Sequence, residues 1–467
     1  MSGPLSLEPG GVEADTLALR LAAPRPRRAP DDAMPAKRPP GRGPEEEAVS
    51  TLAAGLADSI APAVHPYEVA ALLEAEGLSA SVIKERYGHP NLFSLATALY
   101  ERVPRTFPEP PSATDPWRPD TLRCLLRGAL FALPALAYLL TAPLWPLVRH
   151  APVLIVAGIA SWAWGQALGH RAYLRLVAGR RQACGTLLSG SLLGAAFATS
   201  LAVLPADSAL AVGAAAAQSL YLAAASVLLV LARERLLLAA LSPLIAGAVA
   251  LPWWDPGPEL RAGLPLLALL ATLLAAALVL RAGRSGPAAS DAARPRLLAS
   301  LPYGLFGLAA AVLVMLEGRR QPYMVIALTL SMGPAEWLLY RYRGWSLAAL
   351  RASATPLGFM LRSAAVLGLC LSAYLLLLLP AALLTGSDPA TPLLLAAVLW
   401  TALLLQAFGV AWSPAVLCLA AAAGAAAAVT LPKLPPEPAV LPAACAVTAV
   451  CLMVCAIHRL GRPSPHA

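Results

Sequence analysis

The sequence predicts an all-α protein that crosses a membrane about twelve times, in two six-helix halves, with a small helical bundle ahead of them. Hydrophobic residues make up 58% of the 467 residues and charged residues 13%, whereas soluble domains have about 25% charged residues. The mean hydropathy is +0.66, and long apolar runs follow Gly128. Lipid is therefore the expected solvent for most of the chain.

The region ahead of the apolar runs is polar and is expected to lie in the cytoplasm. Residues 1–44 lack apolar periodicity and predict a disordered tail. Residues 45–103 have short amphipathic patterns, with Gly77 and Ser79 as helix-ending and helix-capping residues, and predict a small helical bundle. Residues 104–127 are rich in proline at their start and predict a linker and a juxtamembrane segment.

About twenty apolar residues cross the hydrocarbon core, and proline, glycine and charge mark the ends of a span. Two very short connections leave a range of ten to twelve spans, with twelve as the best single count. The predicted spans are 128–148, 151–169, 187–204, 209–232, 236–252, 262–280, 298–316, 321–340, 363–384, 390–412, 413–431 and 438–457.

Basic residues are distributed unevenly between alternate loops, which predicts the orientation. One set holds about sixteen arginines: 170–186, 233–235, 281–297, 341–362 and 458–467. The other set holds about five basic residues: Arg149, Arg261, Arg319, Arg320 and Lys433. The positive-inside rule then predicts a cell-membrane protein with both termini in the cytoplasm.

The polar segment 281–297 follows the sixth span and divides the membrane region into halves 128–280 and 298–457, ahead of a tail at 458–467. Each half has a long basic loop after its second span, which suggests parallel repeats. The residues entering these loops also correspond, although chance similarity is an alternative: Ser161-x4-Gln166-x3-His170-Arg171 and Ser331-x4-Glu336-x3-Tyr340-Arg341.

Polar side chains within the apolar runs are the candidates for a substrate path or a gate. Glu336 is the only acid expected within the hydrocarbon and needs a cation, for which Arg341 and Arg343 are the nearest in sequence. A structural salt bridge is the alternative for Glu336, and helix-to-helix hydrogen bonding is the alternative for the amides. The six candidates are Gln166, Arg171, Gln218, Glu336, Arg341 and Gln406.

No catalytic or metal-binding pattern accompanies these residues. The sequence has no HExxH, GxSxG or phosphate-binding glycine loop, and its seven cysteines lack metal-ligand spacing. The formal charge of +9 comes from arginines at span ends, which favours lipid headgroups over nucleic acid. We expect no enzyme activity, no cofactor and no nucleic-acid partner.

The segment Ser331-Met-Gly-Pro-Ala-Glu-Trp337 and the bundle Tyr67–Arg105 resemble a group of actinobacterial multispanning membrane proteins, a resemblance that supplies no activity. The six-plus-six plan resembles the multidrug/oligosaccharidyl-lipid/polysaccharide exporter superfamily. It is also similar to the major facilitators, but the aspartate of their loop signature is absent before Ala178-Gly-Arg-Arg181.

Two functions follow as hypotheses. The first is a transporter, a flippase or exporter of lipid-linked glycan or polysaccharide components that works by alternating access. The second is a scaffold whose bundle 45–103 recruits a cytoplasmic protein for envelope assembly or cell division. A cavity shared by Gln166, Gln218, Glu336 and Gln406 favours transport, and their dispersal favours the scaffold.

Overall fold

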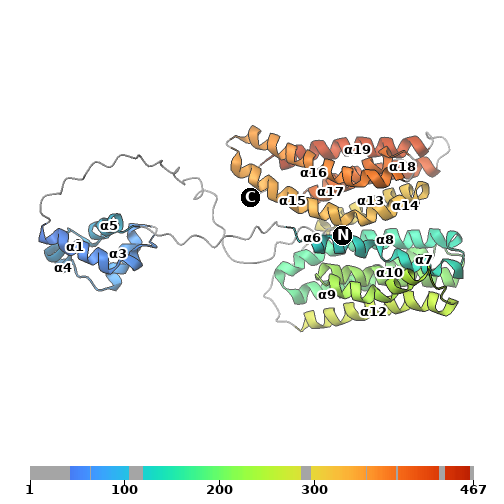
Figure 1. The fold of residues 1–467 in the computed structure, drawn as a ribbon, viewed down its shortest axis with the longest axis horizontal. Helices are drawn as coiled ribbons and strands as arrows, with labels where there is room; N and C mark the ends of the chain where they lie inside the picture. The colour runs from blue at the N-terminus through green and yellow to red at the C-terminus, as the bar shows by residue number, and fades with distance from the viewer. Residues whose placement is uncertain are drawn as a thin grey trace. The chain divides into compact units, whose positions relative to one another are not determined.

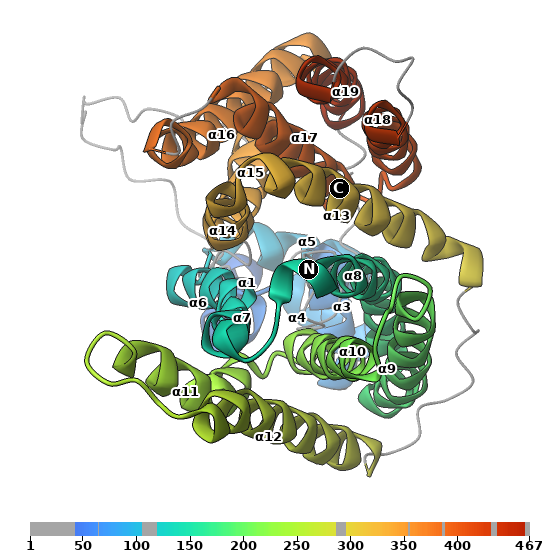
Figure 2. The ribbon, with the colours of Figure 1, turned by 90° about the vertical axis from the view of Figure 1, so that its right-hand side faces the viewer.

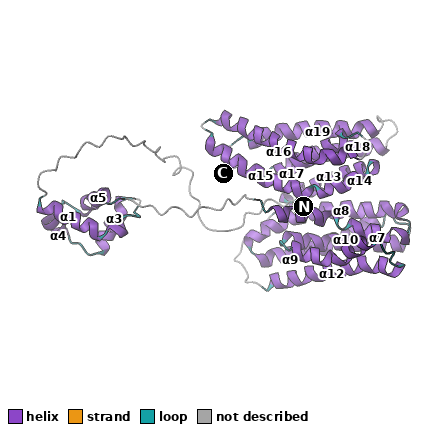
Figure 3. Cartoon of the chain, in the orientation of Figure 1, coloured by secondary structure: helices purple, strands orange, loops and turns teal. Residues whose placement is uncertain are grey.

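A computed structural model describes residues 43–63, 65–104, 119–285, 296–353, 355–384, 388–430 and 437–462. Every described element is a helix, which confirms the all-α fold class for this part of the chain (Figures 1 and 3). The described residues fall into two compact units, one within 11–116 and one within 117–467. The predicted tail 1–44 lies outside the described residues except at its end, and most of the linker 104–127 lies outside them too.

The first unit is a bundle of five short helices: α1 (Pro44–Gly55), α2 (Ala57–Ile60), α3 (Pro66–Ala75), α4 (Ala80–Tyr87) and α5 (Leu92–Arg102). Ser79 caps α4 by accepting a hydrogen bond from the Val82 N–H, as its position predicts. Gly77 has φ +75°, the left-handed conformation that ends α3. Ile60, Leu73 and Leu95 are fully buried, so the bundle has an apolar core of its own.

The second unit contains the apolar helices. Its α-helices are α6 (Thr121–Ala132), α7 (Ala135–Thr141), α8 (Leu147–Ala178), α9 (Arg180–Ala202), α10 (Ala209–Val230), α11 (Glu234–Ala250), α12 (Pro258–Arg284), α13 (Leu301–Arg320), α14 (Pro322–Leu330), α15 (Met332–Ala352), α16 (Pro356–Leu384), α17 (Ala390–Ala407), α18 (Trp412–Thr430) and α19 (Glu437–Leu460). Two 3-10 turns, Ala142–Leu144 and Leu297–Ala299, adjoin α7 and α13.

Among the described residues, ten helical segments are long and apolar enough to cross a membrane, which agrees with a multi-pass membrane protein. The predicted spans 236–252 and 321–340 are not among the ten. The first of these is α11, with 17 residues. The second is divided into α14 and α15, because the helix is interrupted at Ser331.

Two buried apolar clusters lie on either side of residue 297 in the chain. One is formed by residues between Leu130 and Leu280, and the other by residues between Phe306 and Leu460. We call the helices that build them the first group (α6–α12) and the second group (α13–α19), and Figure 2 shows the two groups facing each other. Helix α17 is the centre of the second group, since 72% of its span is buried.

Helix α13 joins the groups by packing on α8 of the first and α18 of the second. Its glycines allow a close approach to α8, because a Cβ atom on Gly307 would lie 2.7 Å from Gln166 Cγ. A Cβ atom on Gly304 would lie 3.2 Å from that of Ala167. Small residues of this kind are the usual means by which helices associate in lipid.

Helix α6 makes a second close crossing, with α14 and α15. A Cβ atom on Gly128 would lie 2.6 Å from the Leu330 carbonyl oxygen, and one on Gly333 would lie 2.6 Å from the Cys124 carbonyl oxygen. Both obstacles are backbone atoms, which cannot move aside as a flexible side chain can. The two glycines therefore fix how closely α6 approaches the second group.

We expect Gly128→Ala to lower stability by about 1–3 kcal/mol, because the added methyl group meets the backbone of α14 and α15. Gly368→Ala in α16 is the matched control, since a Cβ atom there meets no other atom within 4 Å. That variant should be neutral or slightly stabilising, because alanine is the better helix former. Thermal unfolding of the purified full-length chain in detergent measures both, and equal melting temperatures would contradict the close crossing.

Candidate functional site

Arg127 of α6 is the centre of an ion network that joins three helices. Its guanidinium donates to Glu336 of α15 at 2.5 Å and to Glu234 of α11 at 2.8 and 2.9 Å. Arg123, one turn earlier on α6, also donates to Glu234, at 2.9 Å. The side chains of Arg127, Glu234 and Glu336 are 12%, 7% and 12% exposed, so the charges are largely removed from solvent and lipid.

The structure corrects the predicted partner of Glu336. Neither Arg341 nor Arg343 pairs with it, although both follow it on α15, and its partner comes instead from α6. Arg341 stacks over Trp337 and Trp345, at 4.8 and 5.9 Å from the ring centres, and Arg343 lies over Phe408. Glu336 therefore joins the two helix groups and does not form a local pair.

Glu336 is also not the only buried acid. Glu234 and Glu317 are 6% and 1% exposed, because α11 begins before the predicted span 236–252 and α13 continues beyond the predicted span 298–316. Both acids lie just outside the predicted spans. The ends of a helix are the hardest feature to predict from a sequence pattern. The predicted burial of Glu234 and Glu317 depended on where α11 begins and where α13 ends.

A cavity of about 460 Å³ lies between the two helix groups. Its walls are mostly apolar or aromatic, with Phe131, Trp162 and Tyr221 from the first group and Phe306, Met332 and Trp400 from the second. Trp400 is held by a hydrogen bond from its indole N–H to the Ala335 carbonyl oxygen, at 3.3 Å. The volume and the apolar lining suit the hydrocarbon part of a ligand.

A few polar atoms interrupt this apolar lining. Gln166 of α8 and Gln218 of α10 both line the cavity, and Gln218 Nε2 donates to the Leu154 carbonyl oxygen at 3.2 Å. Gln218 Oε1 and the Ser161 hydroxyl are buried without a hydrogen-bond partner among the described residues. Buried polar atoms are normally paired, so these two are available to a polar group of a ligand.

The ion network borders one end of the cavity. Leu130 and Phe131, which line the cavity, follow Arg127 within about one turn of α6, and Ala335, another lining residue, precedes Glu336. Leu237 lines the cavity about one turn after Glu234. The three helices that form this end of the cavity are thus tied together by Arg127.

Glu234 of the Arg127 network follows the C-terminal end of α10, a helix about 33 Å long. A second ion cluster lies at the N-terminal end of the same helix. Asp207, in the loop before α10, accepts from Arg149 at 2.6 Å and lies 3.1 Å from His150. The hydrogen bond from Arg149 lowers the pKa of the Asp207 carboxyl from its ordinary value. This cluster joins α8 to the α9–α10 loop within the first group only.

The candidate residues separate into two sets. Gln166 and Gln218 line the cavity and Glu336 adjoins it, whereas Arg171, Arg341 and Gln406 are not among the lining residues. Gln406 is 3% exposed, within the buried centre of α17. Of the four polar residues expected to share a cavity, Gln166, Gln218 and Glu336 therefore lie in or beside it and Gln406 does not.

Three residues of the network, Arg123, Arg127 and Glu234, are not among the candidates that the sequence predicts. A signal was present, since Arg123 and Arg127 are four residues apart and so share one helix face, opposite an apolar stripe. A separate contact between the helix groups involves His170 of α8, whose ring stacks on that of Tyr303 with centroids 3.8 Å apart and whose Nδ1 lies 3.1 Å from the Ser300 hydroxyl.

The arrangement of the described residues suits the binding of a molecule with an apolar part and a polar part. Its parts are an apolar cavity, two unpaired polar atoms on its wall and a charged closure at one end. Comparison of the chain with protein-family models, with curated proteins and with solved structures gave no match.

We expect Arg127→Met to lower stability by about 3–5 kcal/mol, because Glu336 loses its cation and Glu234 keeps only Arg123. The triple variant Arg127→Met, Glu234→Gln, Glu336→Gln removes the charges together and should recover most of the loss. Thermal unfolding in detergent compares the two with the wild type. A triple variant no more stable than Arg127→Met would mean that buried charge is not the source of the loss.

Proposed function

We propose that this chain is a membrane transporter for an amphipathic lipid, moving lipid-linked glycan or polysaccharide components by alternating access between its two helix groups. The observation that carries the proposal is the apolar cavity between the groups, bordered at one end by the Arg127 network. The resemblance of the six-plus-six plan to the multidrug/oligosaccharidyl-lipid/polysaccharide exporters is part of the proposal.

The lining of the cavity argues for a lipid over a small polar solute. A sugar or an ion needs many hydrogen-bonding groups to replace its water, whereas this wall is apolar with a few polar atoms. The hydrocarbon chain of a lipid is satisfied by such a wall. The unpaired oxygen atoms of Gln218 and Ser161 then contact the first polar atoms of the headgroup.

The ion network supplies a gate in this proposal. Alternating access requires contacts that form in one state and break in the other, and charged pairs that join two moving bodies are suited to this role. Arg127 pairs with Glu336 across the groups and with Glu234 within the first group. Separation of α15 from α6 breaks the first pair and leaves Arg127 neutralised by the second.

Twelve crossings in six-plus-six halves are also part of the proposal. Helix α11 is about 25 Å long and is connected at each end to a long helix. A helix of this length can cross the bilayer without tilting where the bilayer is thin. Helices α14 and α15 together provide one broken crossing. The predicted long loops 170–186 and 341–362 are mostly helical, since α8 ends at Ala178, α9 begins at Arg180 and α15 continues to Ala352. With α11 and the broken crossing counted, the connections within the arginine-rich segments still fall on one side, which supports cytoplasmic termini.

We expect the turns near Asp255 and Asp388 to lie outside the cell, opposite the N-terminus. A single epitope tag inserted at each turn should bind antibody in intact cells, whereas an N-terminal tag should bind only after permeabilisation. The same tag placed at Ser353, between α15 and α16, is the control for a cytoplasmic loop. Labelling of Asp255 or Asp388 tags only after permeabilisation would contradict twelve crossings.

We expect Ala311→Trp, which fills the cavity, to reduce transport at least about tenfold, since the indole occupies the space for the lipid chain. Ala196→Trp on the exposed face of α9 is the matched control and should transport as the wild type does. The assay uses proteoliposomes with a fluorescent polyprenyl-linked oligosaccharide and a quencher confined to the outside. Equal rates in wild-type and protein-free vesicles would contradict the transporter.

A membrane scaffold is the second candidate, favoured by the separate bundle α1–α5. This unit has its own core, and on its surface Tyr67 and Phe93 form an edge-to-face pair in which the two residues are 67% and 57% exposed.

Deletion of residues 45–103 separates the two functions. A transporter keeps lipid movement in proteoliposomes after the deletion, whereas a scaffold loses its effect on surface glycans in cells and moves no lipid in either form.

A further inference from the structure

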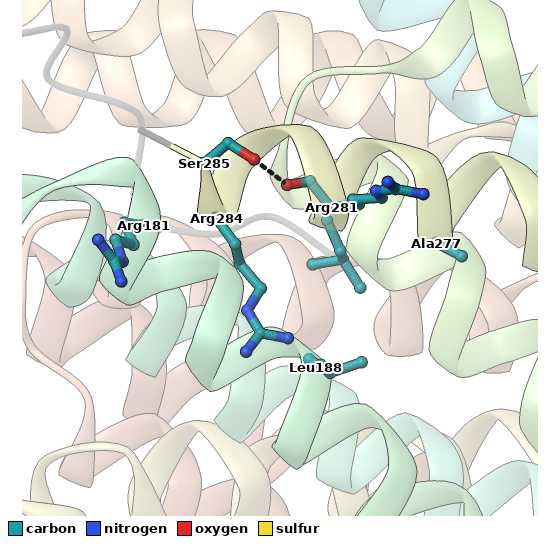
Figure 4. Close-up of a pocket in the computed structure, with 7 residues that line it drawn as sticks. Arg181, Leu188, Ala277, Arg281, Arg284 and Ser285 are labelled. Carbon is teal, nitrogen blue, oxygen red and sulfur yellow. Dashed lines mark hydrogen bonds between the residues drawn. The ribbon is translucent and has the colours of Figure 1, made fainter. Parts of the chain in front are cut away.

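Three arginines surround a hollow of about 430 Å³ between α9 and α12, away from the central cavity (Figure 4). Arg181 comes from the first turn of α9, and Arg281 and Arg284 come from the last turn of α12. The Ser285 hydroxyl, which donates to the Arg281 carbonyl oxygen at 3.2 Å, also lines the hollow. We call this site the arginine pocket.

The charges of the arginine pocket are not balanced by the protein around it. Within the part of the chain that the structure describes, no carboxylate forms an ion pair with Arg181, Arg281 or Arg284. Arg281 and Arg284 are also three residues apart, where like charges on a helix repel. The cluster is unfavourable by itself and is relieved by an anion.

The backbone of α9 adds to the positive potential. Gly179 is the N-cap of this helix and has no side chain with which to cap it. The first N–H groups of α9 therefore keep their hydrogen-bonding capacity at the positive end of the helix dipole, next to Arg181. Phosphate is the anion that such N–H groups and guanidinium groups bind best together.

The remainder of the pocket is apolar and lies where lipid headgroups are expected. Leu188 of α9 and Ala277 and Leu280 of α12 form its other walls, with Leu188 about two turns beyond Arg181 and Ala277 about one turn before Arg281. Helix α12 has 27 residues and is about 40 Å long, so its last turn extends beyond a hydrocarbon core about 30 Å thick. The pocket thus presents guanidinium groups at headgroup level and apolar side chains at acyl-chain level.

We propose that the arginine pocket binds the phosphate headgroup of an anionic phospholipid, with the acyl chains along Leu188 and Leu280. A soluble phosphate ion meets the same charges but makes no use of the apolar walls. The site is distinct from the transport cavity, so its occupant is a bound lipid and not the transported one. The proposal holds whether the chain is a transporter or a scaffold.

The test is thermal unfolding of the full-length protein in detergent with added phosphatidylglycerol, phosphatidylcholine or inorganic phosphate. Phosphatidylglycerol should stabilise the wild type more than phosphatidylcholine does. The triple variant Arg181→Gln, Arg281→Gln, Arg284→Gln should bind phosphatidylglycerol more weakly by about fivefold for each arginine removed. The matched control Arg235→Gln, Arg296→Gln, Arg351→Gln removes the same charge from exposed arginines outside the pocket and should bind as the wild type does.

Three outcomes overturn the proposal. Equal stabilisation by the two lipids would remove the requirement for an anionic headgroup, and equal loss in both triple variants would reduce the effect to overall charge. Stabilisation by inorganic phosphate as large as that by phosphatidylglycerol would assign the pocket to a free anion. The variant Arg181→Lys, Arg281→Lys, Arg284→Lys keeps the charge without the forked donors, and should bind phosphatidylglycerol between the wild type and the glutamine variant.

Discussion

A charged side chain among membrane helices has to find an opposite charge, since neither lipid nor apolar side chains can solvate it. Arg127 meets this requirement with two carboxylates on two other helices. Because Glu234 belongs to α11 and Glu336 to α15, the same pairing sets the position of α6 relative to both helix groups. The backbone contacts of Gly128 and Gly333 lie beside it, so electrostatics and close packing act at one crossing.

Packing in the rest of the apolar unit depends on small side chains. In lipid there is no hydrophobic gain on bringing two apolar helices together, so contact area and fit decide which helices associate. Gly304 and Gly307 give α13 close contact with α8, and alanine is the most frequent residue on the buried faces of α9 and α10. The larger side chains, such as Trp400 and Phe306, are at the cavity, where their rings form walls without filling the space.

The charged groups of this unit lie at different levels along the helices from the apolar wall of the cavity. The arginine pocket lies where α9 begins and α12 ends, Glu234 of the Arg127 network begins α11, and Asp207 with Arg149 lies at the opposite ends of these helices. Between them the wall of the cavity is apolar, with Gln166, Gln218 and Ser161 as the exceptions. A molecule with an apolar chain and a charged head fits this distribution of polarity, whether it is carried through the cavity or held at the rim.

The sequence by itself determined that the chain is helical and that most of it is apolar enough for lipid, because length and hydropathy of a run depend on neighbouring residues alone. It also identified Gln166, Gln218 and Glu336 as unusual, since a polar side chain within an apolar run costs free energy of insertion into the membrane whichever side of the helix it is on. Only the tertiary structure decided the partner of Glu336, because Arg127 is 209 residues away and its selection over Arg341 depends on how α6 crosses α15. The cavity and the arginine pocket are likewise products of packing, since each is formed by side chains from helices whose mutual placement no local pattern encodes.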